Sequence, residues 1–143
     1  MCRLLNEHGV RYILAGGVAA NLHGSVRTTK DVGVLVPKNL DNTKRLLEAL
    51  SGLPYAVARE LDAAQVVDKP ITIVDDDPRV NILTVAWTVP YEQAERTREL
   101  RTILGVPVPY LSRADLIQSK QTGRPSDLAD IEALSPARDD QTA

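Results

Sequence analysis

Residues 11–36 have the sequence RYILAGGVAANLHGSVRTTKDVGVLV, and this stretch decides the fold. A short apolar run predicts a strand at 11–15, the pair Gly16-Gly17 follows it, and a short helical pattern covers 18–23. After a polar loop, apolar side chains alternate over 31–36, which is the spacing of a strand with two different faces. The stretch therefore predicts a strand, a glycine turn, a helix, a loop and a second strand.

The rest of the chain adds helices and strands around this unit. The turn chemistry of Asp75-Asp76-Asp77-Pro78 predicts a solvated hairpin turn between two strands. Prolines in the last strand place it at an edge of the sheet. Helices are expected at 2–8, 39–51, 91–101, 113–120 and 126–134, the last capped by Ser126, and strands at 71–74, 80–85 and 106–111.

These elements predict an α/β (or α+β) fold with a mixed, twisted sheet and helices packed largely on one side. The length of 143 residues and a hydrophobic share of 43% suit one core, so a single domain is expected over 1–134. The polar segment 135–143 is expected to be a disordered tail.

The composition excludes several kinds of site. Cys2 is the only cysteine, so neither an internal disulfide nor a cysteine zinc cluster can form. A formal net charge of −2 argues against a broadly basic surface for nucleic acids. No apolar run approaches the roughly 20 residues of a membrane span. We therefore expect a cytoplasmic protein that does not associate with membranes.

Three features point to phosphate chemistry. Backbone amides at Gly16-Gly17, where a helix begins, suit a phosphate because they are unpaired donors. Asp31 begins the next strand, where a carboxylate could hold Mg²⁺ against a triphosphate. A later strand, 80–85, could lie beside it and bring a further polar side chain.

Four segments carry a resemblance to a known family: LAGGVA at 14–19, HGSVRTTKDV at 23–32, RVNIL at 79–83 and DLIQSKQTGRPSDLAD at 115–130. Together they resemble the minimal nucleotidyltransferase superfamily, in particular its small single-domain bacterial members, which include the nucleotidyltransferase toxins of toxin–antitoxin pairs. The resemblance implies a nucleotidyltransferase-like fold that binds a nucleoside triphosphate and Mg²⁺ at a triad of carboxylates.

The chain departs from the family pattern at two of the three acidic positions. Gly33 and Asn81 stand where the family has acids, so Asp31 is the one remaining catalytic and metal-binding candidate. Glycine offers no side-chain ligand, and an asparagine amide is a neutral oxygen donor that does not act as a general base. A two-metal mechanism is therefore hard to build from these residues.

Each remaining site residue has both a ligand-binding and a structural interpretation. In the structural interpretation, the glycines serve only to allow a tight turn, and Asp31 pairs with Arg27 or Lys30. Arg124 pairs with Asp127 or Asp130. The phosphate- or nucleotide-binding candidates are Gly16, Gly17, Arg27, Lys30, Lys120 and Arg124.

The sequence leaves three functions open, and with them whether the chain is an enzyme. The first is a degenerate nucleotidyltransferase-like protein, a pseudoenzyme that binds a nucleotide, another anion or a protein partner. The second is an active Mg²⁺-dependent enzyme that moves a nucleoside monophosphate from a triphosphate to a hydroxyl of RNA or protein; without activity, no cofactor is expected. The third is a structural subunit of a toxin–antitoxin-like complex, with an antitoxin-like partner.

Overall fold

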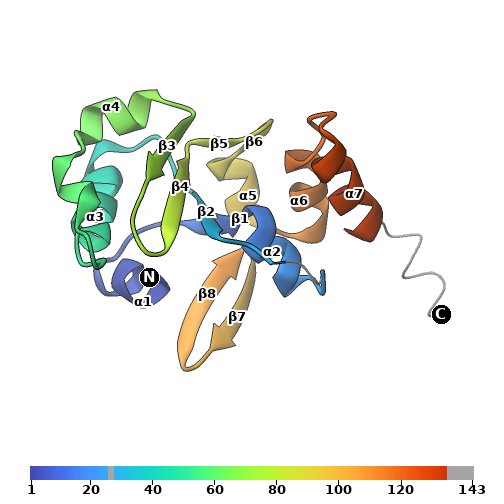
Figure 1. Ribbon diagram of the computed structural model, residues 1–143, viewed down its shortest axis with the longest axis horizontal. Helices are drawn as coiled ribbons and strands as arrows, with labels where there is room; N and C mark the ends of the chain where they lie inside the picture. Colours follow the sequence, from blue (N-terminus) through green and yellow to red (C-terminus); the bar gives the residue numbers. More distant parts are fainter. Residues whose placement is uncertain (26–27, 135–143) are drawn as a thin grey trace.

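The computed structural model describes residues 1–25 and 28–134 and has the predicted α/β architecture (Figure 1). The helices are α1 Cys2–Glu7, α2 Gly16–Leu22, α3 Leu40–Leu50, the 3-10 helix η1 Val57–Glu60, α4 Ala63–Asp68, α5 Tyr91–Thr97, α6 Arg113–Ser119 and α7 Pro125–Leu134. The strands are β1 Ile13–Ala15, β2 Asp31–Leu35, β3 Ile71–Val74, β4 Arg79–Leu83, β5 Val85–Ala86, β6 Val89–Pro90, β7 Glu99–Ile103 and β8 Val106–Tyr110. Arg27 and the tail 135–143 lie outside the described residues.

Six strands form a mixed sheet in the order β3-β4-β2-β1-β8-β7. Strand β2 runs parallel to β4, and β1 runs parallel to β8, whereas the other neighbours are antiparallel. The predicted hairpin is present as β3 and β4. The predicted neighbour of the Asp31 strand is confirmed as β4, so segments almost fifty residues apart in sequence lie side by side.

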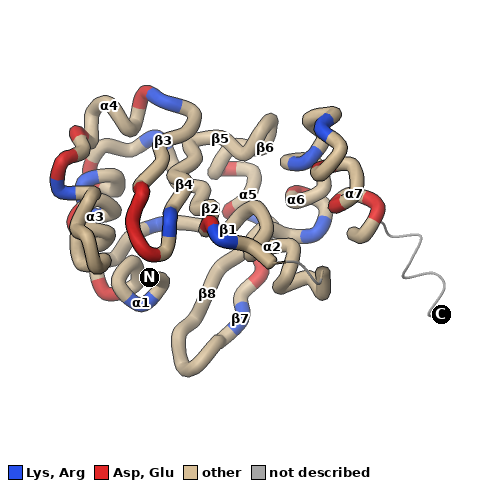
Figure 2. The backbone as a smooth tube through the Cα atoms, in the orientation of Figure 1, with Lys and Arg blue, Asp and Glu red and all other residues tan. Residues whose placement is uncertain are grey.

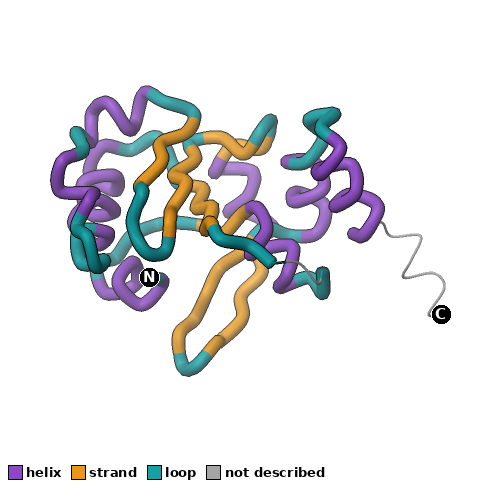
Figure 3. The backbone as a smooth tube through the Cα atoms, viewed as in Figure 1, coloured by secondary structure: helices purple, strands orange, loops and turns teal. Residues whose placement is uncertain are grey.

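The two faces of the β2–β4 region differ in burial because side chains alternate along each strand. Val34, Val80 and Ile82 occupy one face and are at most 1% exposed. The opposite face carries Asp31 and Asn81, which are only partly buried. Helix α3 packs against α1, η1 and α4, and this helical group lies together on one side of the strands (Figures 1 and 3). The other face, called the open face below, is bordered by α2, α6 and α7 and holds a pocket (Figure 1).

Helix α3 is tied to the chain segment that enters β1. Asn39 caps the helix by accepting a hydrogen bond from the Asn42 backbone N–H at 2.8 Å. The fully buried Asn42 side chain accepts from the Arg11 N–H at 2.7 Å and donates to the Arg11 carbonyl at 3.0 Å. This pair of hydrogen bonds sets the start of β1, and therefore the position of the glycine turn that follows it.

The C-terminal half corrects three sequence predictions. The helix expected over 91–101 ends at Thr97, because Arg98 adopts an extended ψ of 147° and the chain continues as β7. All five residues of β7 are exposed, so no hydrophobic alternation marked it as a strand. Strand β7, not β8, forms the edge. Strand β8 lies inside the sheet, and it tolerates its prolines because it pairs with β1 only at Tyr110, opposite Leu14. The last helix begins at Pro125 and not after a Ser126 cap. Proline suits the first helical position, because a backbone N–H there would have no partner within the helix.

Among the described residues, no helix is both long enough and apolar enough to cross a membrane.

Candidate functional site

A pocket of about 670 Å³ lies on the open face of β2 and β4. Its volume falls within the range of small-molecule sites, roughly 300–1,000 Å³. Three groups of residues line it. The floor includes Asp31, Gly33, Arg79 and Asn81; one wall includes Gly16, Gly17 and 28–30; and the other includes Lys120, Arg124, Asp127 and Asp130. The pocket therefore brings together every predicted site residue that the structure describes.

The glycine turn forms the first turn of α2 and not merely a loop before it, which corrects the predicted helix start. Gly16 has φ +70°, a conformation that favours glycine. A Cβ on Gly17 would lie 3.0 Å from Thr29 Oγ1, and that hydroxyl donates to the Asp31 carbonyl at 2.9 Å. The backbone conformation at Gly16 and the close contact at Gly17 therefore both explain why glycine suits these positions. The start of α2 packs directly on the loop that leads to Asp31.

The three positions of the family's acids lie next to one another on the pocket floor. Asp31 faces Arg79 across the β2–β4 pair, and Gly33 faces Asn81. Gly33 is buried, and a Cβ built on it would lie 3.2 Å from the Ala15 carbonyl oxygen. The floor therefore holds one carboxylate, and its other two positions offer an amide and no side chain.

The donors on this floor do not fit a carboxylate site for Mg²⁺. Throughout residues 1–25 and 28–134, no three Asp, Glu, His or Cys side chains gather closely enough to hold a metal ion. Mg²⁺ prefers hard, anionic oxygen ligands in near-octahedral geometry, and Asp31 is the only one that this floor supplies.

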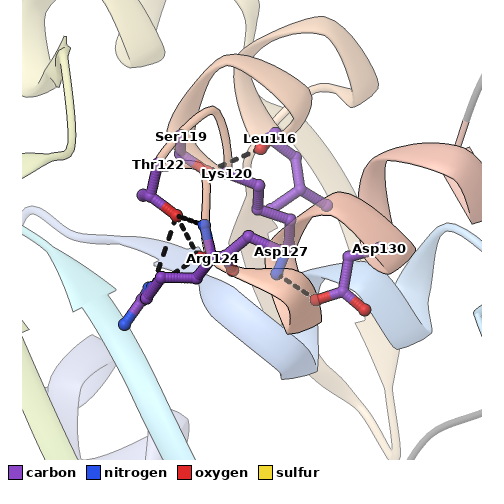
Figure 4. A network of polar contacts seen from close by, with 7 residues as sticks. All are labelled: Leu116, Ser119, Lys120, Thr122, Arg124, Asp127 and Asp130. Carbon is purple, nitrogen blue, oxygen red and sulfur yellow. Dashed lines mark hydrogen bonds and ion pairs between the residues drawn. The ribbon is translucent and has the colours of Figure 1, made fainter.

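The basic residues at the C-terminal wall are held by acids (Figure 4). Lys120 Nζ lies 2.8 Å from Asp130 Oδ2, and both side chains are at most 10% exposed. Arg124 Nε lies 2.7 Å from Asp127 Oδ2, which confirms one of the two predicted pairings, and its side chain is 71% exposed. Lys120 is thus engaged in a buried pair, whereas the end of the Arg124 side chain remains accessible.

The loop before β2 contributes an exposed cation. Lys30 lines the pocket, and the described part of the chain offers it no ion-pair partner, so the predicted pairing of Lys30 with Asp31 is absent. Arg79, on the floor, has only a long contact of 3.9 Å from its Nε to Asp75 Oδ1, with both side chains largely exposed. Lys30 and Arg79 are therefore available to an anionic ligand.

The sequence predicted that the acidic turn between β3 and β4 (red in Figure 2) is simply solvated, and this prediction is wrong for Asp76. Asp76 is 8% exposed and accepts backbone N–H bonds from Tyr55, Val57 and Asp77 at 2.7 to 3.1 Å. Burial alone would raise the pKa of the Asp76 carboxyl, but these donors outweigh it and hold the pKa below its ordinary value. Asp76 therefore anchors the 55–57 segment and does not replace a missing acid of the site.

Sequence reasoning missed the apolar part of the pocket. This part lies at the end of the pocket away from the glycine turn and Lys30, and it is lined by Ile71, Leu83, Val85 and Trp87. Trp87, the only tryptophan, is 55% exposed and lies between β5 and β6. The only sequence feature that could have indicated Trp87 is that it is the single tryptophan, next to a threonine in a short connection between strands. No hydrophobic periodicity connected it with the site.

The comparison with known proteins adds no family to this description. No protein-family model matches the chain, and no curated protein matches it either. The interpretation of the pocket therefore rests on its geometry and on the four sequence segments that resemble nucleotidyltransferases.

Proposed function

We propose that the chain is a nucleotidyltransferase-like protein that binds a nucleotide or a similar anion in this pocket and has little or no transfer activity. One observation carries the proposal. Gly33 and Asn81, which replace the expected acids, lie directly opposite each other on the pocket floor beside Asp31.

The balance of charge around the pocket favours an anion. Asp127 and Asp130 are engaged by Arg124 and Lys120, which leaves Asp31 as the unengaged acid among the lining residues that the structure describes. Lys30 and Arg79 are both exposed, and their two positive charges outnumber this single carboxylate. A concave site with more available cations than acids attracts phosphate groups without a bridging metal.

The same floor argues against efficient transfer. A two-metal mechanism uses several carboxylates to hold the cations, and an acid on the neighbouring strand to deprotonate the attacking hydroxyl. The Asn81 amide stands at the position of that acid and does not take a proton near neutral pH. Asp31 alone would have to serve both purposes.

Calorimetric titration with ATP, with and without Mg²⁺, tests the proposal. The unmodified protein should bind ATP with an affinity that changes little when Mg²⁺ is added. Absence of binding of any of the four common nucleoside triphosphates, under both conditions, would refute the proposal. Mg²⁺-dependent release of pyrophosphate at a catalytic rate would refute its second half.

Restoring the acids gives the complementary experiment. Asn81→Asp and the double variant Gly33→Asp/Asn81→Asp should make ATP binding depend on Mg²⁺, because they rebuild the anionic ligand set. The Gly33 change requires the Ala15 carbonyl to move by a few tenths of an ångström, so the single variant guards against misfolding. Thr102→Asp, on exposed β7, adds a carboxylate far from the pocket lining and should leave Mg²⁺ dependence unchanged.

A further inference from the structure

We infer that Trp87 stacks on the base of the bound nucleotide, so that the pocket recognises a nucleoside and not only its phosphates. The inference rests on the proposed function, because it assigns the second half of the same site. It is carried by the position, exposure and backbone conformation of Trp87 and by the residues around it.

Trp87 is held in an unusual conformation at the pocket. Its φ of +58° lies in the left-handed region, which a bulky residue rarely adopts. Trp87 is the first residue of the two-residue turn between β5 and β6, where such turns have a positive φ, so the hairpin itself fixes the place of Trp87 in the pocket. Trp87 is 55% exposed, although it lines a concave site. An exposed tryptophan in a pocket can offer its ring to an aromatic ligand.

The neighbouring surface is apolar. Ile71 and Leu83 face each other across the β3–β4 pair on the open side of the sheet, and both line the pocket. Ile71 is 48% exposed, and Val85 continues the same lining toward Trp87. A flat, weakly polar group such as a nucleobase would cover this surface, whereas a phosphate would gain nothing from it.

A polar network fixes the Trp87 turn against α6. The Gln118 amide donates to Thr88 Oγ1 at 3.0 Å, next to Trp87 in the chain. The Gln93 amide donates to both Gln118 Oε1 and Asp115 Oδ1 at 2.8 Å, and Asp115 is 6% exposed. This chain of contacts anchors an otherwise short connection to a buried carboxylate. The turn that carries Trp87 is therefore positioned before a ligand arrives, which lowers the entropic cost of binding.

The pocket consequently has two chemically different ends. Gly16, Gly17 and Lys30 offer backbone amides and a cation at one end, and Trp87 with Ile71 offers apolar surface at the other. This division matches a nucleotide, in which a charged phosphate chain is joined to a flat aromatic base.

The single tryptophan makes the inference directly measurable. ATP should change the intrinsic tryptophan fluorescence in a saturable manner, whereas inorganic tripolyphosphate should leave it nearly unchanged while still binding by calorimetry. Trp87→Ala should weaken ATP binding by about 5- to 150-fold, which is the range for loss of one base–aromatic stack. Tripolyphosphate binding should change by less than about twofold, because the phosphates do not meet the ring.

Two further variants protect the test from misfolding. Trp87→Asn removes the ring but tolerates the left-handed backbone, so it should reproduce the loss seen with alanine. Trp87→Phe keeps a π-face and should retain most of the ATP affinity. Tyr55→Asn, at a 72% exposed aromatic outside the pocket, is the matched control and should bind ATP as the unmodified protein does.

The outcomes separate the two proposals. Unchanged ATP affinity in Trp87→Asn, with tripolyphosphate still bound, would overturn the stacking and leave the proposed function standing. An equal loss of ATP and tripolyphosphate binding would also overturn it, because Trp87 would then act on the pocket as a whole. If neither ligand binds the unmodified protein, the proposed function fails and this inference fails with it.

Discussion

Replacing Lys120 by methionine tests whether this residue belongs to the fold or to the ligand. The substitution keeps much of the side-chain volume but removes the ammonium group, which lies 2.8 Å from Asp130 Oδ2 with both side chains at most 10% exposed. At an effective dielectric constant of about 20, the attraction across this distance is about 6 kcal/mol, and desolvation of both groups offsets part of it. Removing one partner of a buried pair typically costs about 3–5 kcal/mol. We expect a loss of about 3 kcal/mol, because both side chains retain slight contact with water.

Urea unfolding of Lys120→Met measures this loss, and Arg124→Met is the matched control. Arg124 Nε makes an ion pair of nearly the same length, 2.7 Å, but its side chain is 71% exposed. Exposed pairs contribute about 0–1 kcal/mol, so this variant should unfold nearly as the unmodified protein does. If both variants lose the same small amount, the buried pair does not exist in solution and Lys120 is free to meet a phosphate. The comparison requires that both variants have the urea m-value of the unmodified protein, since this shows that all three unfold from the same compact state.

Three further predictions concern the fold around the pocket. Asn42→Ala should lower the free energy of unfolding by about 1–3 kcal/mol in urea, because it removes the two hydrogen bonds that the fully buried Asn42 side chain makes with the Arg11 backbone. Stability should fall as the pH drops below about 4, through the lowered pKa of Asp76, because the contribution of its carboxylate is complete above the unfolded-state pKa. Asp76→Asn should flatten this pH dependence of the urea midpoint, whereas Asp75→Asn should not. Gly17→Ala should cost about 1–3 kcal/mol in thermal or urea unfolding, because the new methyl group would press on Thr29.

The sequence predicted those elements whose residues have two distinct environments. Strand β2 alternates because Val34 faces the core and Asp31 faces the pocket, and the N-cap of α3 at Asn39 was also correct. The first three residues of β7 were predicted as the end of a helix, and the strand was missed because all its side chains are exposed and therefore show no alternation. Periodicity reports differences in burial, and it does not report backbone conformation where every side chain meets water.

The candidate site was predictable where a backbone constraint or a short spacing defined it. The glycine turn, Asp31 and the Arg124–Asp127 pair could all be proposed from local sequence. The Lys120–Asp130 pair joins two helices across a turn, and its partner choice depends on how those helices pack. Trp87 reaches the pocket only through the β5–β6 connection and the network on α6, which sequence spacing does not express.

The register that places Gly33 opposite Asn81 links the two departures from the nucleotidyltransferase pattern physically. In a sheet, directly opposed carboxylates repel each other unless a cation lies between them, so a metal and its acids depend on one another. Loss of one acid weakens the cation site, and the remaining acid then meets an anionic ligand without compensation. A floor with Gly33 and Asn81 has no such repulsion, and Asp31 is the one carboxylate on it that faces Lys30 and Arg79. On the function that we propose, this floor suits an anion bound directly, whereas a floor with acids at both positions would suit a metal-bridged triphosphate.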